Sequence, residues 1–148
     1  MTDQINARDY IFQVESATPD TWVDILGKTK FTIKMSEKEE VADTTTFESD
    51  GDYESQPMQR GASLTLEGMY LRSSANVRDP GQARMDTLAL AKTEAALSRL
   101  RFRHTIETDW TIWPGWASLA DQGGETNKKG GWGFTWNKSG AASMATVA

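Results

Sequence analysis

A pair of half-buried β-strands is predicted by two alternating segments, KFTIKM at residues 30–35 and ASLTLEGMYL at residues 62–71. Alternation of this kind places every second side chain on the same face of a strand, so that one face can be buried while the other is solvated. The apolar face is made by these residues: Phe31, Ile33 and Met35 in the first segment, Leu64 and Leu66 in the second. We expect the two segments to pair with each other in one sheet.

The segment that separates the two strands, residues 36–60, shows neither alternation nor a helical period. Between Ser36 and Glu54 it carries eight acidic residues and one basic residue, a local net charge of −7 in a chain whose total is −5. A long segment without regular structure inside a compact domain is usually functional or disordered. A concentrated charge is either solvated or placed to meet another charged surface. We therefore expect a long acidic loop over residues 36–60.

Length and composition restrict the classes of function. The 148 residues fit a single domain, and the lack of cysteine excludes disulfides, thiolate metal sites and a cysteine nucleophile. The single histidine, His104, lies on the apolar face of a predicted strand, and we interpret it as a core residue. We expect no catalytic, cofactor-binding or metal-binding residue and no enzymatic activity. The negative charge argues against nucleic-acid binding through phosphate neutralisation, and no apolar run is long enough to span a bilayer.

The rest of the chain is predicted as further strands and one helix. Residues 1–10 are interpreted as an N-terminal arm, residues 11–140 as the domain and residues 141–148 as a frayed tail. Strands are predicted at Ile11–Glu15, Arg101–Glu107, Asp109–Ala120 and Trp132–Asn137. The short apolar piece Trp22–Leu26 fits either a helical turn or a bulged strand. The fold class is α+β and mainly β, with antiparallel strands and one flanking helix.

The helix has a clear start. Asp79 can cap it, Pro80 suits the first helical position, and Gln82–Leu100 is rich in residues that favour helices. Leu90 and Leu97 lie nearly opposite the main apolar stripe and predict a second contact. A loop of the same domain and a neighbouring subunit both fit that contact.

Tryptophan is unusually common near the C-terminal end. The chain has six tryptophans, and five of them fall in its last third: Trp110, Trp113, Trp116, Trp132 and Trp136. They fit either an aromatic platform for sugar rings or packing inside the sheet. Packing is the favoured interpretation, because buried tryptophan fills space between layers. The platform makes a carbohydrate-binding β-sandwich module the first alternative function.

Three segments resemble the major tail tube proteins of long-tailed, siphovirus-type bacteriophages, especially those that infect actinobacteria. They are TTFESDG at residues 45–51, RGASLTLEG at residues 60–68 and RDPGQ at residues 78–82. The resemblance covers residues 31–137 and rests on the order and spacing of these segments. It implies a β-sandwich flanked by a helix, with six copies closing into a ring through an inter-subunit β-barrel. The rings stack into a hollow tube that serves as the conduit for DNA.

The resemblance also implies where copies meet. The loop over residues 36–60 would reach the adjacent ring, and the candidate inter-ring residues are Glu39, Asp43, Phe47, Asp50, Asp52 and Tyr53. Leu90 and Leu97 form the candidate inter-subunit helix face. Glu67, on the polar face of a strand, is the candidate residue of the lumen wall, because an acidic wall repels DNA phosphates.

The expected partners follow from this interpretation. They are other copies of the chain, the tape measure protein and other tail proteins, with transient passage of DNA and no membrane. The expected location is the virion tail, after synthesis in the cytoplasm of the bacterial host. A second alternative function is another ring-forming tail component, such as a terminator, whose rings do not stack.

Overall fold

The structure, a computed structural model, describes residues 3–147. Its strands are β1 (Tyr10–Glu15), β2 (Trp22–Asp24), β3 (Lys28–Asp43), β4 (Ser55–Met69), β5 (Ser98–His104), β6 (Asp109–Leu119), β7 (Gly131–Lys138) and β8 (Ser143–Thr146). Its helical elements are α1 (Pro80–Leu90) and the 3₁₀ turns η1 (Ala7–Asp9), η2 (Phe47–Ser49) and η3 (Thr93–Ala96). None of the helices between residues 3 and 147 has the length and hydropathy needed to cross a membrane.

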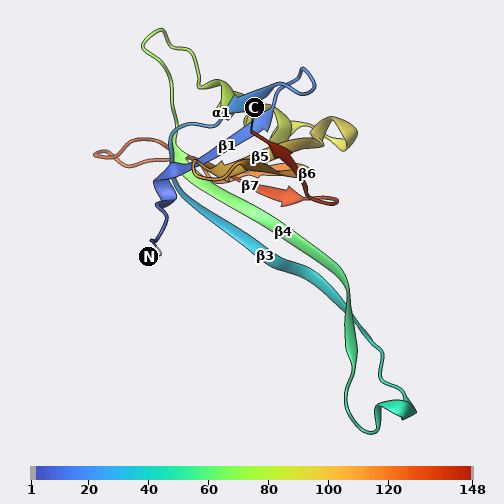
Figure 1. The fold of residues 1–148 in the computed structure, drawn as a ribbon. Helices are drawn as coiled ribbons and strands as arrows, with labels where there is room; N and C mark the ends of the chain where they lie inside the picture. Colours follow the sequence, from blue (N-terminus) through green and yellow to red (C-terminus); the bar gives the residue numbers. More distant parts are fainter. Residues whose placement is uncertain (1–2, 148) are drawn as a thin grey trace.

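The strands form one antiparallel sheet in the order β2-β1-β5-β6-β7-β4-β3, with β8 paired to β6 (Figure 1). The sheet curls, because Phe31 of β3 packs against Tyr10 and Phe12 of β1 at ring-centroid distances of 4.8 and 5.1 Å. These two strands lie near opposite ends of the sheet order and are not paired by hydrogen bonds. The predicted antiparallel fold with one flanking helix is confirmed, with both layers built from one continuous sheet that does not close within the chain.

The core lies inside this curl, under α1. The fully buried side chains include Phe12, Leu64, Leu66, Phe134 and Trp136 from the strands and Met85 and Leu88 from the helix. The predicted pairing of residues 30–35 with residues 62–71 is confirmed, since Phe31 lies opposite Leu66 and Ile33 opposite Leu64. Phe31, Ile33, Leu64 and Leu66 therefore share the inner face, as the period of a strand requires. The prediction for Met35 is wrong, because this side chain is exposed where β3 leaves the body.

The helix starts where it is predicted and ends earlier. The Asp79 side chain accepts a hydrogen bond from the backbone N–H of Gln82 at 3.2 Å, and Pro80 occupies the first helical position. The predicted continuation to Leu100 is wrong, because α1 ends at Leu90 and β5 begins at Ser98. The helix-favouring composition of this segment is overridden by the pairing of β5 with β6 and β1.

The acidic segment is a β-hairpin and not the predicted long loop. Strand β3 continues to Asp43 and β4 begins at Ser55, so only residues 44–54 lie outside the two strands. Beyond residues 35 and 62 the two strands leave the body together as a ribbon, which we call the arm (residues 35–62; Figure 1). Register shifts between Lys34 and Glu37, and again around Glu40, break the alternation that would have revealed these strands in the sequence.

Both ends of the chain are more regular than expected. In the predicted N-terminal arm, Ala7–Asp9 form η1 and Tyr10 already belongs to β1. In the predicted frayed tail, Ser143–Thr146 form β8 on β6, so that interpretation is wrong. Residues 1, 2 and 148, which belong to these two predictions, lie outside the described residues. The segment Trp22–Leu26 forms the short strand β2, as its strand alternative required.

Candidate assembly surfaces

His104 has a structural role. It is buried, and its Nε2 lies 3.0 Å from the backbone oxygen of Asn6, while its Nδ1 accepts from the N–H of Ile106 at 3.3 Å. Both ring nitrogens are therefore occupied by backbone groups that hold the N-terminal segment and the β5–β6 turn. The interpretation of His104 as a core residue is confirmed.

The C-terminal tryptophans pack inside the domain. Trp110, Trp113, Trp132 and Trp136 are buried, while Trp116 is partly exposed. The indole N–H of Trp136 donates to the backbone oxygen of Trp113 at 3.2 Å, and that of Trp132 to Asp86 Oδ1 at 3.0 Å. A sugar platform needs open ring faces side by side. Trp113, Trp132 and Trp136 belong to the core, and the ring of Trp110 is covered by Arg101 and Arg103. The packing interpretation is therefore confirmed for four of the five tryptophans, and their rings offer no open platform.

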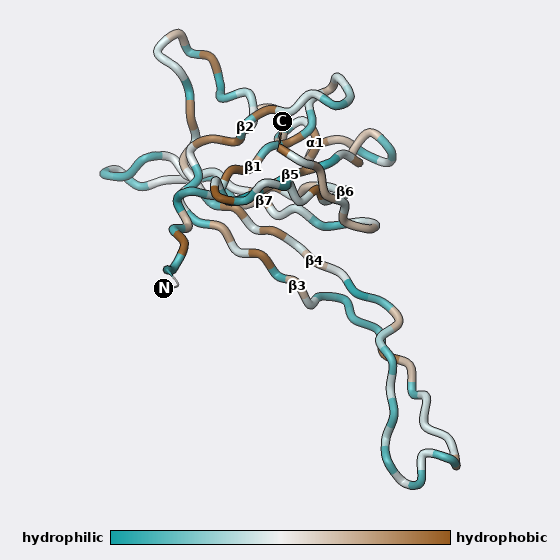
Figure 2. Tube along the Cα trace, in the orientation of Figure 1, coloured by the Kyte–Doolittle hydropathy of each residue, from teal (hydrophilic) through white to brown (hydrophobic). Residues whose placement is uncertain are grey.

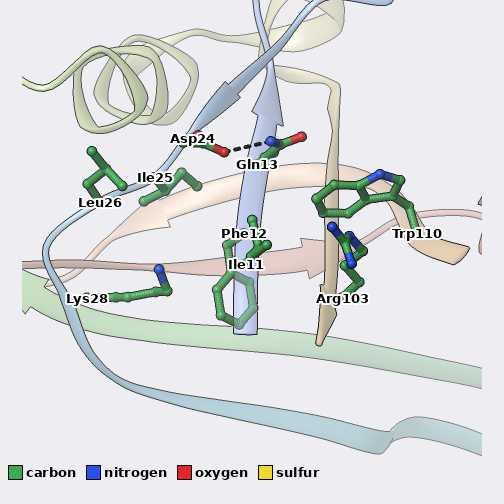
Figure 3. Close-up of a pocket in the computed structure, with 9 residues that line it drawn as sticks. All are labelled: Ile11, Phe12, Gln13, Asp24, Ile25, Leu26, Lys28, Arg103 and Trp110. Atoms are coloured by element: carbon green, nitrogen blue, oxygen red, sulfur yellow. Dashed lines mark hydrogen bonds between the residues drawn. The ribbon is translucent and has the colours of Figure 1, made fainter. Parts of the chain in front are cut away.

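A hollow of about 300 Å³ opens beside β1 (Figure 3). On its rim the side-chain N–H of Gln13 donates to Asp24 Oδ1 at 2.6 Å, and Lys28 and Arg103 approach from the sides. Asp24 is the single carboxylate among the lining residues, so the hollow lacks a pair of carboxylates. Within residues 3–147, no three metal-ligating side chains are grouped to hold an ion.

The arm is an exposed two-stranded ribbon. Met35, Val41 and Met58 are exposed along it, and Figure 2 shows that its outer half is mostly hydrophilic. Among the described strands, β3 pairs only with β4, and β4 pairs with β7 only from Ser63 onward, so both edges of the arm carry free backbone groups. An isolated two-stranded ribbon is at best marginally stable in water, and a free edge is a template for another chain. The arm therefore suits a contact with another molecule.

The end of the arm, which we call the tip (residues 43–54), is tightly organised. Thr45 Oγ1 accepts from the N–H of Glu54 at 2.9 Å and donates to its oxygen at 3.1 Å, which closes the loop. Thr46 and Ser49 form a reciprocal capping box around η2. Asp43 Oδ1 accepts from the N–H of Thr45 at 2.9 Å, and hydrogen bonding by Thr45 lowers the pKa of that carboxyl.

The structure gathers most of the predicted inter-ring residues on this tip. Phe47 is fully exposed on η2, and Tyr53 is also exposed. The acidic candidates are solvent-exposed as well: Asp43, Asp50 and Asp52 on the tip and Glu39 on the shaft of the arm. Aromatic side chains held out by a rigid loop are typical of contact anchors, because little conformational entropy is lost when they bind.

Glu67 lies on the outer, polar face of the sheet. It is exposed and sits directly opposite Lys30 on β3 and Gly133 on β7. Beside it, a row of hydroxyl side chains crosses four strands in register: Thr32, Thr65, Thr135 and Ser118. The two central hydroxyl oxygens, of Thr65 and Thr135, are 3.3 Å apart. This face is therefore hydroxyl-rich, with the charge of Glu67 set against that of Lys30.

Leu90 and Leu97 are exposed but do not share a helix face. Leu90 ends α1 with 75% of its side-chain surface exposed, and Leu97 follows η3 with 55% exposed. The predicted continuous helix that would have aligned them is not present in residues 80–100. Both remain large exposed apolar side chains, one at each end of the segment that joins α1 to β5 through η3.

A stack of arginines and tryptophans on the outer face of β5 was not predicted from the sequence. The guanidinium of Arg101 lies between Trp22 and Trp110, 4.4 and 4.2 Å from the ring centroids, and burial lowers its pKa. Arg99 forms ion pairs with Glu15 and Asp20, and its hydrogen bond lowers the pKa of Glu15. The alternation of arginine at residues 99, 101 and 103 is the sequence signal that could have revealed this stack.

No protein-family model matches the sequence, and no curated protein matches it. Solved structures do resemble the fold. A chain from the tail of an empty gene transfer agent particle, refined with helical C6 symmetry, has a TM-score of 0.65 and 17% identity, with coverage of 98% of this chain and 100% of that one. A chain from the virion of a native gene transfer agent particle gives a TM-score of 0.67 and 15% identity, over 97% and 100% of the two chains.

A third similar chain comes from the six-fold symmetrised baseplate of the anti-feeding prophage, with a TM-score of 0.62, 13% identity and 99% coverage of both chains. At these identities the likeness concerns the fold. The curled sheet, the flanking helix and the arm therefore form a fold shared with chains of tail, virion and baseplate particles, and the match extends over the whole length of each chain.

Proposed function

We propose that the chain is the structural subunit of a phage-like tail tube, in which six copies form a ring and the rings stack. The observation that carries this proposal is the likeness of the whole chain to chains of a tail with C6 symmetry and of a six-fold symmetrised baseplate. The role is structural and involves no catalytic step. The virion tail is the proposed location.

The unfinished sheet supports ring formation. The free outer edge of β3 can pair with a neighbour, and a ring of copies closes the sheet into an inter-subunit barrel that leaves no open edge. The hydroxyl-rich outer face around Thr65 then lines the lumen, with Glu67 as the wall residue. Leu90 and Leu97 contact the neighbouring subunit in the same ring.

The arm supports stacking. It projects from the body and presents Phe47 and the acidic tip, so it is placed to reach a copy in the adjacent ring (Figure 1). In the assembly it would bury its exposed apolar residues and pair its free edges. Glu39, Asp43, Asp50, Asp52 and Tyr53 belong to the same inter-ring contact.

The sequence resemblance supports the finer parts of the proposal. The particle is a long-tailed one of the siphovirus type, and the protein is made in the cytoplasm of an actinobacterial host. Its partners are the tape measure protein and other tail proteins. DNA passes transiently through the tube.

Electron microscopy of the purified, concentrated protein tests the proposal. We expect hollow tubes with six-fold symmetry in cross-section. Rings that never stack at high concentration would favour a terminator-type component instead. A sample that stays monodisperse as single molecules at high concentration would overturn the proposal.

A further inference from the structure

The tip of the arm carries an unbalanced charge. Between Asp43 and Glu54 there are five carboxylates and no basic residue. Within residues 3–147, none of these five carboxylates takes part in an ion pair. Fully exposed Phe47 stands in the middle of this charge. The tip is therefore both anionic and aromatic, on a loop already fixed by hydrogen bonds.

A hollow of opposite character lies at the start of β3, against the N-terminal turn η1. It measures about 390 Å³. It is lined by Ala7, Arg8, Lys28, Thr29, Lys30 and Phe31. Three of these residues are cationic and none is acidic. We call this hollow the basic pocket.

The cations of the basic pocket lack counter-ions within residues 3–147. Neither Arg8 nor the half-buried Lys28 takes part in an ion pair or a side-chain hydrogen bond there. Burial lowers the pKa of Lys28, and only the neighbouring carboxylate of Asp24 opposes this shift. Lys30 faces Glu67 across the strands without reaching ion-pair distance. An anion that enters the pocket would therefore meet unneutralised positive charge.

The pocket also has an aromatic floor. Phe31 packs one side of its ring against Tyr10 and Phe12 and contributes to the pocket lining. Its side chain is only partly buried in the single chain. An aromatic ring that enters between the cations can therefore pack against Phe31 and gain cation–π contact with Arg8 or Lys28.

The two surfaces lie at opposite ends of one strand. The basic pocket includes Lys28, the first residue of β3, and the tip begins at Asp43, the last. Figure 1 shows β3 running from the body out along the arm. With a rise of about 3.3 Å per residue, the 16 residues of β3 separate them by roughly 50 Å. A contact between two different surfaces is head-to-tail, and it repeats as an open stack when the rotation between copies does not close into a ring. This is the geometry that stacking requires.

We propose that the tip of one copy seats in the basic pocket of a copy in the next ring. Phe47 packs against Phe31, and the tip carboxylates pair with Arg8, Lys28 and Lys30. The inference rests on the proposed tube and names the partner surface of the arm within it. It identifies the basic pocket as the surface that binds the tip in the stacking contact.

Charge reversal on each side tests the proposal. The pocket variant is Arg8→Glu/Lys28→Glu and the tip variant is Glu48→Lys/Asp52→Lys. Each variant alone should raise the protein concentration needed for tube formation by about tenfold or more, because like charges then face each other. A single chain that carries all four substitutions, or a mixture of the two variants, should form tubes again. Rings should persist throughout, since the proposed ring contact uses the backbone edge of β3 and the four substitutions change side chains only.

Two further variants keep the outcome clear. Lys128→Glu/Lys129→Glu makes the same change in net charge at exposed loop positions that neither line the pocket nor lie at the proposed ring contact, and it should leave the critical concentration unchanged. Arg8→Gln/Lys28→Gln removes the positive charge of the pocket without introducing acids. It replaces the pocket variant if Lys28→Glu, at a half-buried position, lowers the stability of the fold. Circular dichroism and thermal melting confirm that each variant is folded.

The outcomes separate the two proposals. Unmodified protein that forms neither rings nor tubes contradicts the proposed function. If the unmodified protein forms tubes and the pocket variant stacks normally, the tip-to-pocket contact is overturned and the proposed function stands. The same holds if the chain with all four substitutions stays as folded rings. A carbodiimide crosslink between tip carboxylates and Lys28 or Lys30, found only between ¹⁴N and ¹⁵N copies of assembled mixtures, is the positive signature.

Discussion

Gln82 shows how one buried amide can position three segments of this chain. Its side-chain N–H groups donate to the backbone oxygens of Leu26 and Met69 at 3.0 and 2.8 Å, and its Oε1 accepts from the N–H of Leu71 at 3.1 Å. It therefore ties α1 to the ends of β2 and β4. In the sequence it stands out only as the last residue of the RDPGQ segment at residues 78–82, and no local pattern predicts its burial.

The first prediction is that Gln82→Met destabilises the domain by about 2–4 kcal/mol, since an isosteric apolar side chain leaves three backbone groups without these partners. The measurement is chemical denaturation. Gln59→Met is the control, because Gln59 is exposed and donates one hydrogen bond, to the oxygen of Lys38. We expect a change of less than about 0.5 kcal/mol for the control. Equal effects of the two substitutions would contradict the structural role of Gln82.

A second prediction at this scale concerns pH. The hydrogen bond from Arg99 is the largest cause that lowers the pKa of Glu15 below its ordinary value of 4.5. A carboxyl whose folded-state pKa is depressed contributes stability above its unfolded-state pKa and loses it as the pH falls through the folded value. Glu15→Gln should therefore lower the melting temperature at pH 7 and have little effect well below pH 4.5. A difference between variant and parent that stays constant across this window would exclude the ion pair as its cause.

At the scale of elements, the sequence predicted strands wherever alternation was unbroken. The two strands and their partnership were predicted in this way, while the register that sets Phe31 opposite Leu66 came from the structure. The arm could not be predicted in this way. Its bulges shift the register several times, Lys38 adopts a positive φ of 53°, and its side chains are exposed on both faces, so no apolar period exists to detect.

The helix illustrates the same limit. Asp79 and Pro80 are local signals for its start, and the structure confirms them. Its end is set by tertiary structure, since Thr93 takes a positive φ of 55° and the chain from Ser98 joins the sheet. Local propensity continues past Leu90, but pairing with β6 stabilises the strand over the helix.

A third prediction concerns the arm. Deletion of Glu39–Glu54 should leave the body folded, because this segment contributes no buried core residue, while stacking is abolished. Thermal melting and electron microscopy measure the two effects. A cooperative melt with isolated rings is the expected result. Loss of the cooperative melt would show that the arm is part of the folding unit.

The fourth prediction separates assembly from stability at the α1–β5 connection. Leu90→Asp/Leu97→Asp should impair ring formation with little change in melting temperature, because both side chains are already exposed in the single chain. Met85→Asp is the matched comparison, since Met85 is fully buried and its replacement should lower the melting temperature strongly. If the exposed pair lowered the melting temperature as much as Met85→Asp, these leucines would belong to the core and not to a subunit contact.

At the scale of the whole molecule, the acidic tip and the basic pocket lie at opposite ends of β3. The arm holds eight acidic and two basic residues, a net charge of −6, the rest of the chain is close to neutral at +1, and the sheet is left open at β3. The acidic segment was evident from the sequence, because charge counts need no structure. The basic pocket was not, since Arg8 and Lys28 are brought together only when η1 lies against the start of β3. Surfaces built from distant residues depend on topology, which composition does not encode.

The same division of charge gives the last prediction, at Glu67. If the outer sheet face lines the lumen, the negative charge of Glu67 offsets the positive charge of Lys30 on the lumen wall. Glu67→Lys replaces this balance with two neighbouring cations, so the wall attracts DNA phosphates. Tubes should assemble normally, because Glu67 forms no ion pair within residues 3–147. DNA ejection from particles that carry the variant should be slower, and added salt should relieve the delay, since phosphate contacts weaken as counterions compete. Glu125→Lys, an equal charge change at an exposed position of the β6–β7 loop, is the control. Ejection at the parental rate in both variants would place Glu67 outside the lumen, whereas a delay common to both would reflect net charge and not the wall.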